Sequence, residues 1–517
     1  MNETLKRAGQ LGLLARDLAA ARCRRSIPAR ERAVRQVVDR LGLMHGLPQK
    51  IGQLLAFSEM DGSSPQFARL TENAPSLPAE EIFSEFERQT GRRVAECFEW
   101  INRAGISASI GQVHRARLHD GREVAVKVQY PGLRGAVDAD LQALGWLMAP
   151  MGGMRRDFDM AAYRLEIGRM LRAEMDFVSE ARWLGRFAEW TRGWSGVEIP
   201  EVFPEFSNSS VLAMTWVDGV TLAEARQWSE ADRRVAAGMI VKFFLHGVAA
   251  WRCLHADPHP GNYRFRRGER GVTLGVLDFG CVKELDAGFA SGLCTLITEA
   301  MNGGLATGAA NDVAWRAFGE MGFNAALLDP LRPRLGEMAR LLCEPLTSPE
   351  SCRVADWNPG GRLKELLGAE RMAFRLAGPP AMIYFLRAFQ GVLQYLRVLD
   401  VPVDWRSAWS AAMAARVPAH EPATSIQAVP AEPKQTMNSN SLNIRVTDAA
   451  ETKVALSFDA AATDQLPLLV PRELVERLRE RSIDLVQVAT DARQRDYAPG
   501  ELFTYEDGAR TVRVWLA

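Results

Sequence analysis

The sequence predicts an α+β protein with two lobes, preceded by a helical extension and followed by a small C-terminal α+β unit. Three observations support this prediction. The 517 residues are too many for one ordinary hydrophobic core, so several domains are expected. Two strand-like runs in QVHRARLHDGREVAVKVQYPG are joined by Asp120-Gly121, which is a strong hairpin signal. Between residues 218 and 415 the chain is rich in helical patterns.

Each segment of the chain is expected to form its own part of the fold. Residues 1–104 are expected to be mainly helical, because apolar residues recur at helical spacing, as in LGLLARDLAA. Residues 105–217 are expected to form the first lobe, with the hairpin, helical patterns from about 134 to 193 and a strand in SSVLAMTWVDG. Residues 218–415 are expected to form a helical second lobe with one strand pair around YRFRRGERGVTLGVLDFG.

The chain after the second lobe is expected to have two parts. Residues 416–441 are rich in proline, alanine, serine and asparagine and contain few large apolar residues, which predicts a disordered linker. Residues 442–517 predict a small α+β domain with short strands, a helix in PRELVERLRERSI and a final hairpin that turns at Asp507-Gly508. This domain contains no catalytic constellation, so we interpret it as an interaction or dimerisation module that binds a protein partner.

Composition narrows the class of protein. The 63 basic and 63 acidic residues give a formal net charge of zero, which does not suggest a nucleic-acid-binding protein. The seven cysteines include no C-x-x-C pair, which indicates free thiols in a reducing compartment. The most apolar stretch, PAMIYFLRAFQGVLQYLRVL, is interrupted by Arg387 and Arg397 and is typical of a buried amphipathic helix. We expect a cytoplasmic protein without a transmembrane segment, a description that is compatible with peripheral contact with the inner membrane.

Two residues stand where phosphate and metal ligands would be needed. Lys127 lies in the strand-like VAVKV and follows the small-residue segment SASIGQVH, as does the lysine that holds ATP phosphates in kinase folds. Taken alone, it would be interpreted as a solvent-facing lysine. Asp278 follows the apolar GVL and begins a D-F-G tripeptide, and an acidic residue at a strand end can bind a Mg²⁺ that bridges phosphates. D-F-G often arises by chance, but its position downstream of the lysine strengthens the interpretation.

The segment LHADPHPGNY is compatible with a metal site, a structural turn or a catalytic loop. Kinase catalytic loops place an Asp five residues before an Asn, and Asp257 and Asn262 have the same interval. Asp257 would orient or deprotonate the acceptor group, and Asn262 would bind a second Mg²⁺. Ala256 replaces the Arg of the kinase H-R-D motif, so control by phosphorylation of an activation loop is not expected.

A histidine metal site is the less convincing interpretation of this segment. His255 and His259 would need a shared helix face to bind one metal ion with Asp257, and Pro258 and Pro260 prevent that helix. We therefore expect His255 to be a structural, hydrogen-bonding residue. We expect His259 to have no special role or to face the substrate.

The lysine of a kinase fold pairs with a glutamate on a regulatory helix. An amphipathic helical stretch, RLEIGRMLRAEMDFVSEARWLGRF, lies between the lysine strand and the next strand. Glu180 in this stretch is the predicted partner of Lys127, and a solvated helix carboxylate is the alternative. Together these motifs predict a two-lobed protein-kinase-like fold with ATP and Mg²⁺ as cofactors.

The chain resembles the UbiB family (also called AarF or ADCK) of atypical protein-kinase-like proteins over roughly residues 40–400. QKIGQ resembles the family's K-x-G-Q signature, with Lys50 and Gln53 in place, and EMDFVSEA resembles its E-x-D signature, with Glu174 and Asp176. HADPHPGN and LDFG complete the set. The resemblance implies that the helical extension lies over the place of a protein substrate, and that the E-x-D residues reach towards Lys50 and the metal–nucleotide site in a regulatory role.

SASIGQVHRA resembles the Ala-rich loop that replaces the Gly-rich loop of kinases in this family. The resemblance implies that Ala108, Ser109, Gly111 and Gln112 contact the nucleotide. Ile106 and Ser107 stand where the family has alanines, which bears on nucleotide selectivity.

The function implied by the resemblance is that of a Mg²⁺–ATP-dependent atypical kinase or ATPase. Such a protein would support ubiquinone or other isoprenoid-lipid metabolism, or a related small-molecule pathway, with a lipid-like or protein substrate. The alternative is a nucleotide-gated scaffold that recruits biosynthetic enzymes.

Overall fold

The computed structural model divides the chain into two compact units, residues 1–430 and 431–517, and each is described by itself. The described residues of the first unit are 76–131 and 168–415, apart from 109, 171, 270, 371–373, 375 and 376. Those of the second unit are 441–448, 451–459, 463 and 478–517, apart from 480, 482, 496, 508 and 509. The predicted K-x-G-Q segment, with Lys50 and Gln53, and most of the predicted linker lie outside these ranges.

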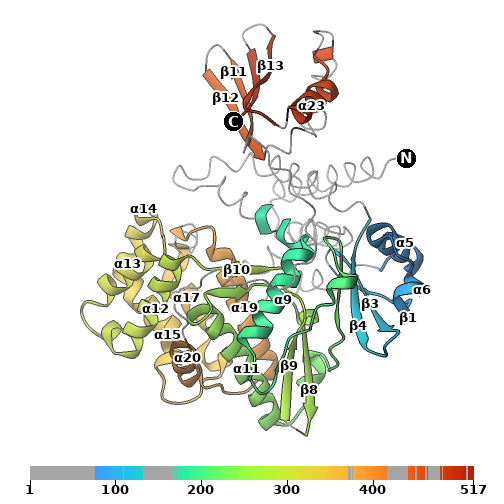
Figure 1. Cartoon of the computed structure of the whole chain (residues 1–517). Helices are drawn as coiled ribbons and strands as arrows, with labels where there is room; N and C mark the ends of the chain where they lie inside the picture. Colours follow the sequence, from blue (N-terminus) through green and yellow to red (C-terminus); the bar gives the residue numbers. More distant parts are fainter. Residues whose placement is uncertain are drawn as a thin grey trace, which may run out of the picture. The chain divides into compact units, whose positions relative to one another are not determined.

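A five-stranded antiparallel sheet forms the first lobe (Figure 1). The order along the sheet is β1-β3-β4-β6, and β2 pairs with β3 at one end. The hairpin predicted at Asp120-Gly121 is confirmed: it joins β3 to β4, and Gly121 has a φ of 87°, which favours glycine. The strands are β1 (Phe98–Ile101), β2 (Ile106–Ser107), β3 (Gly111–Leu118), β4 (Glu123–Gln129) and β6 (Val211–Thr215).

Strand β1 is an element that the sequence analysis did not foresee within residues 1–104, which it expected to be mainly helical. Its sequence, FEWI, is aromatic and β-branched, and it pairs with β3 from Phe98 to Ile101. The described part of the expected extension is otherwise helical, with α5 (Ala79–Thr90) and α6 (Val94–Cys97). Phe86 of α5 is buried against Phe98, with ring centroids 5.5 Å apart, so the strand anchors the helix.

Helix α9 (Phe177–Trp190) carries the predicted lysine partner, but the helical stretch around it is not continuous. The chain turns at Met175, and Asp176 begins α9 as its N-cap. This correction has a local cause, because an Asp side chain that bonds free N–H groups of the first turn favours a helix start at that position. The buried Phe187 of α9 packs on Phe279, with ring centroids 4.8 Å apart, which fixes the helix to the D-F-G segment.

The second lobe is mainly helical, as predicted, and contains two small sheets (Figure 1). The predicted strand pair is confirmed as β8 and β9, which also pairs with β5, and β7 pairs with β10. The strands are β5 (Val197–Glu198), β7 (Cys253–His255), β8 (Tyr263–Gly268), β9 (Gly271–Val276) and β10 (Val282–Glu284). The helices with at least nine residues are α11 (Glu230–Ala249), α12 (Ala287–Met301), α13 (Ala310–Glu320), α15 (Leu335–Thr347), α17 (Pro359–Leu367), α19 (Met382–Leu399) and α20 (Trp405–Ala414).

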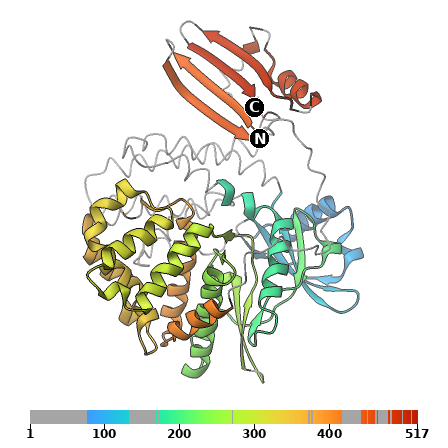
Figure 2. The ribbon, with the colours of Figure 1, turned by 60° about the vertical axis from the view of Figure 1, so that its left-hand side comes forward.

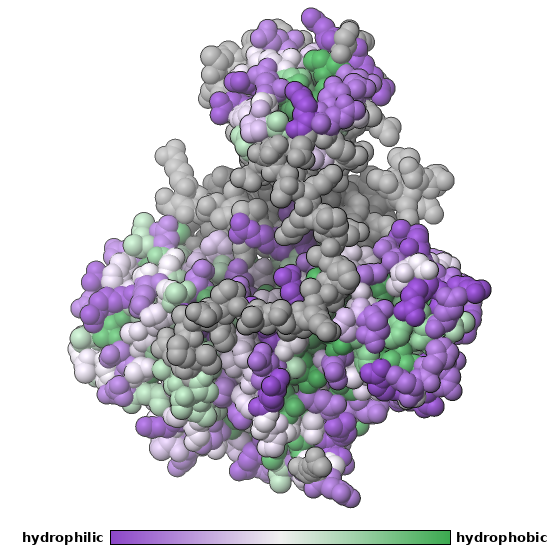
Figure 3. Space-filling model, in the orientation of Figure 1, coloured by the Kyte–Doolittle hydropathy of each residue, from purple (hydrophilic) through white to green (hydrophobic). Residues whose placement is uncertain are grey.

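Helix α19 is the amphipathic helix predicted from the most apolar stretch of the sequence. Within the described ranges, no helix has both the length and the hydropathy that a membrane span requires. The face of the molecule in Figure 3 carries many hydrophilic residues, and the outward side of α5 is an example, with exposed Glu80, Glu81, Glu87 and Arg88. None of the six described cysteines forms a disulfide bond.

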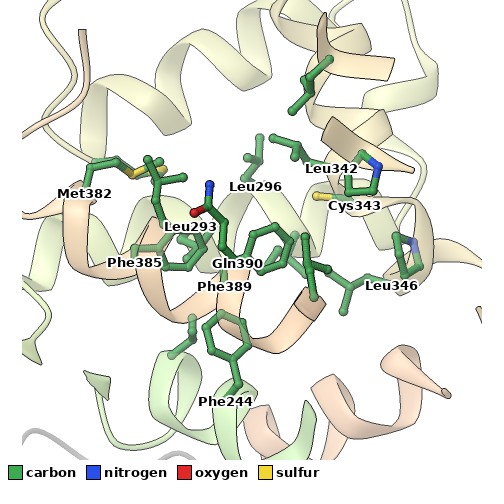
Figure 4. Close-up of a pocket in the computed structure, with 18 of the residues that line it drawn as sticks. Phe244, Leu293, Leu296, Leu342, Cys343, Leu346, Met382, Phe385, Phe389 and Gln390 are labelled. Carbon is green, nitrogen blue, oxygen red and sulfur yellow. The ribbon is translucent and has the colours of Figure 1, made fainter. Parts of the chain in front are cut away.

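A cavity of about 120 Å³ lies within the helical lobe (Figure 4). Its walls come mainly from α11, α12, α15, α17 and α19, and nearly all of the side chains that line it are aliphatic or aromatic. Phe385 and Phe389 of α19 lie on this side of the helix, and Gln390 places an amide among the apolar groups.

The C-terminal unit is a four-stranded antiparallel sheet with the order β12-β11-β14-β13 (Figure 2). The predicted final hairpin is confirmed, with Asp507 of β13 opposite Arg510 of β14. The predicted helix in PRELVERLRERSI falls almost entirely outside the described residues. The elements are β11 (Ser441–Asp448), β12 (Glu451–Asp459), α23 (Leu485–Gln494), β13 (Gly500–Asp507) and β14 (Arg510–Leu516).

Candidate active site

Lys127 lies at the centre of a buried ionic cluster. Its Nζ lies 2.9 Å from Oε1 and 3.0 Å from Oε2 of Glu180. The same nitrogen donates a hydrogen bond to Oδ2 of Asp278 at 2.8 Å. Lys127 is 3% exposed and Glu180 is 1% exposed, so these charges are shielded from water and interact strongly. The structure therefore brings together a strand lysine, a helix glutamate and the D-F-G aspartate, as the sequence predicts.

The sheet and helix α9 position this cluster. Lys127 pairs with Val113 of β3 and Leu212 of β6, so it lies on an inner strand of the sheet. Glu180 lies in the first turn of α9. The ring of Phe177, also in that turn, lies 4.9 Å from the Lys127 Nζ, where it supports the ammonium through a cation–π contact.

The cluster contains two carboxylates for one ammonium. Burial and the charge of Asp278 raise the pKa of Glu180 to about 7, although Lys127 opposes this shift. Burial also opposes ionisation of Asp278, but Lys127 lowers the pKa of this carboxyl below its usual value. Burial would lower the pKa of Lys127, but the two carboxylates raise it. With both carboxylates ionised, the cluster has a surplus negative charge, which favours a further cation.

The loop from Asp257 to Asn262 is fastened to the D-F-G segment. The backbone N–H of Leu277 donates to the Asn262 carbonyl oxygen at 2.9 Å, directly before Asp278. Within the loop, Nδ2 of Asn262 donates to the Asp257 carbonyl oxygen at 3.2 Å. These hydrogen bonds hold Asp257, Asn262 and the strand end before Asp278 next to one another.

The donor set fits a Mg²⁺–nucleotide. Mg²⁺ in phosphate-transfer sites is held by one or two protein oxygens together with phosphate oxygens and water. Asp278 offers a carboxylate, and because Nδ2 of Asn262 is used by the loop backbone, the amide oxygen is the atom left for a metal. Lys127 would supply positive charge for the phosphates.

The turn before β3 was predicted to contact the nucleotide through Ala108, Ser109 and Gly111. The N–H of Ala108 donates to the Gly111 carbonyl oxygen at 2.8 Å, which closes the turn. A Cβ on Gly111 would overlap the carbonyl of Val128, so glycine allows close approach of β3 and β4. Ser109 lies outside the described residues. The turn is therefore compact, and its predicted contact with a nucleotide stays a prediction.

Gln112 has surroundings that the sequence analysis did not foresee, and its predicted contact with a nucleotide stays a prediction. It is the neighbour of Val113, which stands opposite Lys127, and successive residues of a strand point to opposite faces of the sheet. Its side-chain Oε1 accepts from the Leu77 N–H at 3.0 Å, and Nε2 lies 3.1 Å from Nε2 of His114. Gln112 therefore supports the segment before α5 on the face away from the lysine.

The two acidic residues of the E-x-D signature have different surroundings. Glu174 is 4% exposed, and its Oε1 lies 3.9 Å from Nη1 of the buried Arg387. Asp176 accepts two backbone N–H bonds at 3.1 Å in the first turn of α9. Asp176 thus has a structural role as a helix cap, which the sequence analysis did not foresee. Any approach of either residue to Lys50 lies outside the described residues.

Arg387 is a site residue that sequence reasoning missed. Its Nη2 lies 2.5 Å from Oδ1 of Asp257, and the arginine is 2% exposed. Burial would lower the pKa of Arg387, but Asp257, Cys281 and Glu174 raise it, so the guanidinium stays charged. The available signal was an arginine within an apolar helical stretch, which the sequence analysis used only to argue against a membrane span.

His255 is the structural histidine that the sequence predicts. Its Nε2 lies 2.5 Å from the Asp278 carbonyl oxygen, which can only accept, so Nε2 carries the proton. The hydroxyl of Tyr263 lies 3.1 Å from Nδ1, which then accepts. Burial lowers the pKa of His255, in agreement with a neutral ring. Nδ1 of His259 accepts the Gly261 N–H at 3.0 Å, and the described residues contain no group of three His, Cys, Asp or Glu that could hold a metal ion.

Comparisons with known proteins agree with this geometry. Residues 69–307 match the ABC1 atypical kinase-like domain. The atypical kinase COQ8 of Schizosaccharomyces pombe is 30% identical over 280 residues, which cover 52% of this chain and 45% of the relative. COQ8 of Saccharomyces cerevisiae is 27% identical over 274 residues, covering 51% and 54% of the two chains. The protein slr1919 of Synechocystis is 30% identical over 249 residues, covering 46% and 42%. The chain thus spans about half the length of these relatives.

A solved structure supports the fold over a larger part of the chain. The complex of Rv3197 with erythromycin from Mycobacterium tuberculosis has a TM-score of 0.50 and 25% identity, and the match covers 73% of this chain and 95% of that one. The matched family domain contains Lys127, Glu180, Asp257, Asn262 and Asp278. The chain therefore has a kinase-like fold, and its residues 69–307 are similar to the ABC1 atypical kinase-like domain.

Proposed function

We propose that this protein is a Mg²⁺–ATP-dependent phosphotransferase or ATPase. The observation that carries the proposal is the buried contact of Lys127 with both Glu180 and Asp278, beside a loop that supplies Asp257 and Asn262. Phosphoryl transfer needs positioned charges rather than covalent chemistry from the protein, and this set provides them.

Each residue of the set has a role in this proposal. Lys127 binds the phosphates, and Glu180 holds the lysine in place from the side of α9. Asp278 and Asn262 provide oxygen ligands for Mg²⁺. Asp257 orients the acceptor hydroxyl or water. The bound Mg²⁺–nucleotide supplies the transferable phosphoryl group.

The class of acceptor is proposed from the family resemblance rather than from the site. The chain resembles COQ8 proteins in its kinase-like domain, and the family resemblance implies ubiquinone or other isoprenoid-lipid metabolism. We therefore propose a lipid-like or protein acceptor in such a pathway, and peripheral contact with a membrane is part of that proposal.

Thermal unfolding with and without Mg²⁺–ATP tests the proposal. We expect Mg²⁺–ATP to raise the melting temperature of the wild-type protein, because a ligand that binds only the folded state stabilises it. Lys127→Met and Asp278→Asn should abolish the shift. Lys283→Met is a matched control, since Lys283 is a lysine on β10 outside the ionic cluster. A wild-type protein that shows no shift with Mg²⁺–ATP would contradict the proposal.

A second measurement separates an enzyme from a nucleotide-gated scaffold. Asp257→Asn should lower ATP turnover to a small residual rate and leave Mg²⁺–ATP binding in place, because Asp257 is assigned to the acceptor. A deletion strain that recovers its normal lipid-quinone content with Asp257→Asn, but not with Asp278→Asn, would favour the scaffold.

A further inference from the structure

Helix α19 brings a buried arginine to the aspartate of the catalytic loop. Nη2 of Arg387 lies 2.5 Å from Oδ1 of Asp257. The other terminal nitrogen, Nη1, lies 3.6 Å from Sγ of Cys281 and 3.9 Å from Oε1 of Glu174. The guanidinium therefore contacts the catalytic loop, the residue after the D-F-G tripeptide and the segment before α9, which are remote from one another in sequence.

Arg387 shares one face of α19 with Gly391 and Tyr395, and this face packs on the catalytic loop and on Tyr263, the first residue of β8. Gly391 follows one turn later, and a Cβ at this position would overlap the ring of Pro258. Tyr395 follows after another turn, and its ring packs edge-on against Tyr263 with the centroids 5.0 Å apart. Residues spaced by four lie on one face of a helix, so a single face of α19 supports the loop along its length.

Because Asp257 is buried, its contact with Arg387 is needed to keep the carboxylate ionised. Asp257 is 8% exposed, and a buried carboxylate needs an opposite charge and hydrogen bonds to stay ionised. A guanidinium keeps its charge at all relevant pH values, and its planar donors fix the direction of the group that they bind. The residue before Asp257 does not supply this positive charge, because it is the buried Ala256, where the kinase H-R-D motif has an arginine.

We propose that Arg387 is a positioning residue that orients the Asp257 carboxylate for the acceptor group. This inference rests on the proposed function, which assigns Asp257 to the acceptor. An oriented carboxylate has lost its rotational freedom before the acceptor arrives, and such preorganisation accelerates the transfer step rather than nucleotide binding. A purely structural arginine would affect folding and nucleotide binding together.

The test compares Arg387→Lys with Arg397→Lys, which changes an exposed arginine on the same helix. Lysine keeps the buried positive charge but loses the planar pair of donors. For Arg387→Lys we expect the KM for ATP to stay within about twofold of wild type and kcat to fall roughly 10- to 100-fold. Arg397→Lys should leave both constants unchanged. A wild-type kcat for Arg387→Lys, or a loss of nucleotide affinity that matches the loss of kcat, would overturn the inference.

Asp257→Asn provides a second arm that depends on coupling between the two residues. If Arg387 acts through Asp257, adding Arg387→Lys to Asp257→Asn should lower the residual kcat no further. Equal losses of kcat in both backgrounds would show that the arginine acts elsewhere.

If Arg387→Lys fails to fold, a variant pair that removes both charges keeps the inference testable. Asp257→Asn combined with Arg387→Met should be nearly as stable as Asp257→Asn alone, whereas Arg387→Met alone should melt at a much lower temperature. Equal losses of stability from Arg387→Met in both backgrounds would contradict the pairing. Failure of the proposed function has a different signature, because the wild-type protein would then show no binding of Mg²⁺–ATP.

Discussion

At the residue scale, the site is governed by an imbalance of charge. Glu180 and Asp278 both contact the ammonium of Lys127, and Lys127 and Glu180 are held away from water, whereas the Asp278 side chain is 25% exposed. In the absence of another cation, a proton on Glu180 reduces the excess negative charge of this cluster. Burial and the charge of Asp278 raise the pKa of Glu180 to about 7. A bound Mg²⁺ would also compensate the excess negative charge. We therefore expect binding of the Mg²⁺–nucleotide to compete with protonation of Glu180.

This imbalance predicts how stability depends on pH. Because the pKa of Glu180 is about 7 in the folded protein and 4.5 ordinarily, the folded state binds more protons than the unfolded state between these values. The contribution of Glu180 to the free energy of unfolding is complete below its ordinary pKa of 4.5 and is lost as the pH rises through 7. The free energy of unfolding falls by up to about 1.4 kcal/mol per pH unit in this interval. Urea unfolding of the nucleotide-free protein at several pH values would measure this loss.

Glu180→Gln should remove this part of the pH dependence, because glutamine does not titrate. Glu189→Gln is the matched control, since Glu189 is an exposed glutamate on the same helix and should leave the pH profile unchanged. Parallel profiles for the wild type and Glu180→Gln would contradict the prediction.

The sequence could identify those site residues that belong to short motifs with a fixed spacing. Asp257 and Asn262 share one loop, and Lys127 and Asp278 lie in strand contexts that a single sequence reveals. Arg387 could not be found in this way, because it lies 130 residues from Asp257 and reaches it only through the packing of α19. The hydrogen bonds of Gln112 could not be foreseen either: the motif names the residue, but the alternation of the strand decides which face of the sheet receives its side chain.

At the element scale, helix α19 has two different faces. Arg387 and Gly391 contact the catalytic loop, Tyr395 packs on Tyr263 directly after it, and Phe385 and Phe389 line the cavity. The sequence predicted the helix from its apolar spacing but gave no reason to place it at the loop. Strand β1 was missed because four residues are too few to establish an alternating pattern, and its pairing with β3 decides its conformation.

The close approach of α19 to the loop predicts opposite effects for two glycines. Gly391→Ala should destabilise the protein by about 1–3 kcal/mol, because the added methyl group overlaps Pro258. Gly238→Ala in α11 is the matched control, because nothing lies within 4 Å of a Cβ there. That change should stabilise the protein by roughly 0.5–1 kcal/mol through helix propensity.

Urea unfolding measures both effects, and the turnover of Gly391→Ala should fall with its stability because the loop is displaced. A Gly391→Ala protein that is stabilised as much as Gly238→Ala would show that α19 does not press on the loop.

At the scale of the whole molecule, the chain contains two units with separate hydrophobic cores. All of the described candidate site residues belong to the first unit. The second unit has a core of its own, which includes Leu442, Leu485 and Val514, so each unit has the means to fold alone. The predicted role of the second unit in binding a protein partner stays a prediction.

Removal of residues 431–517 tests this division. We expect the remaining unit to unfold cooperatively and to keep the Mg²⁺–ATP affinity and turnover of the full chain, because its core and site residues are intact. Calorimetry and steady-state kinetics on the shortened and full chains would measure these quantities. A large loss of turnover without loss of folding would give the C-terminal unit a part in catalysis.

The cavity behind α19 has a consequence for the response of this protein to hydrostatic pressure. An apolar cavity stays dry, and its volume disappears when the chain unfolds into water. A cavity of about 120 Å³ corresponds to roughly 70 mL/mol, and the volume change of unfolding scales with the internal void volume without being equal to it. Compression should therefore act first on the helical lobe, and α19 would transmit that loss of volume to the catalytic loop.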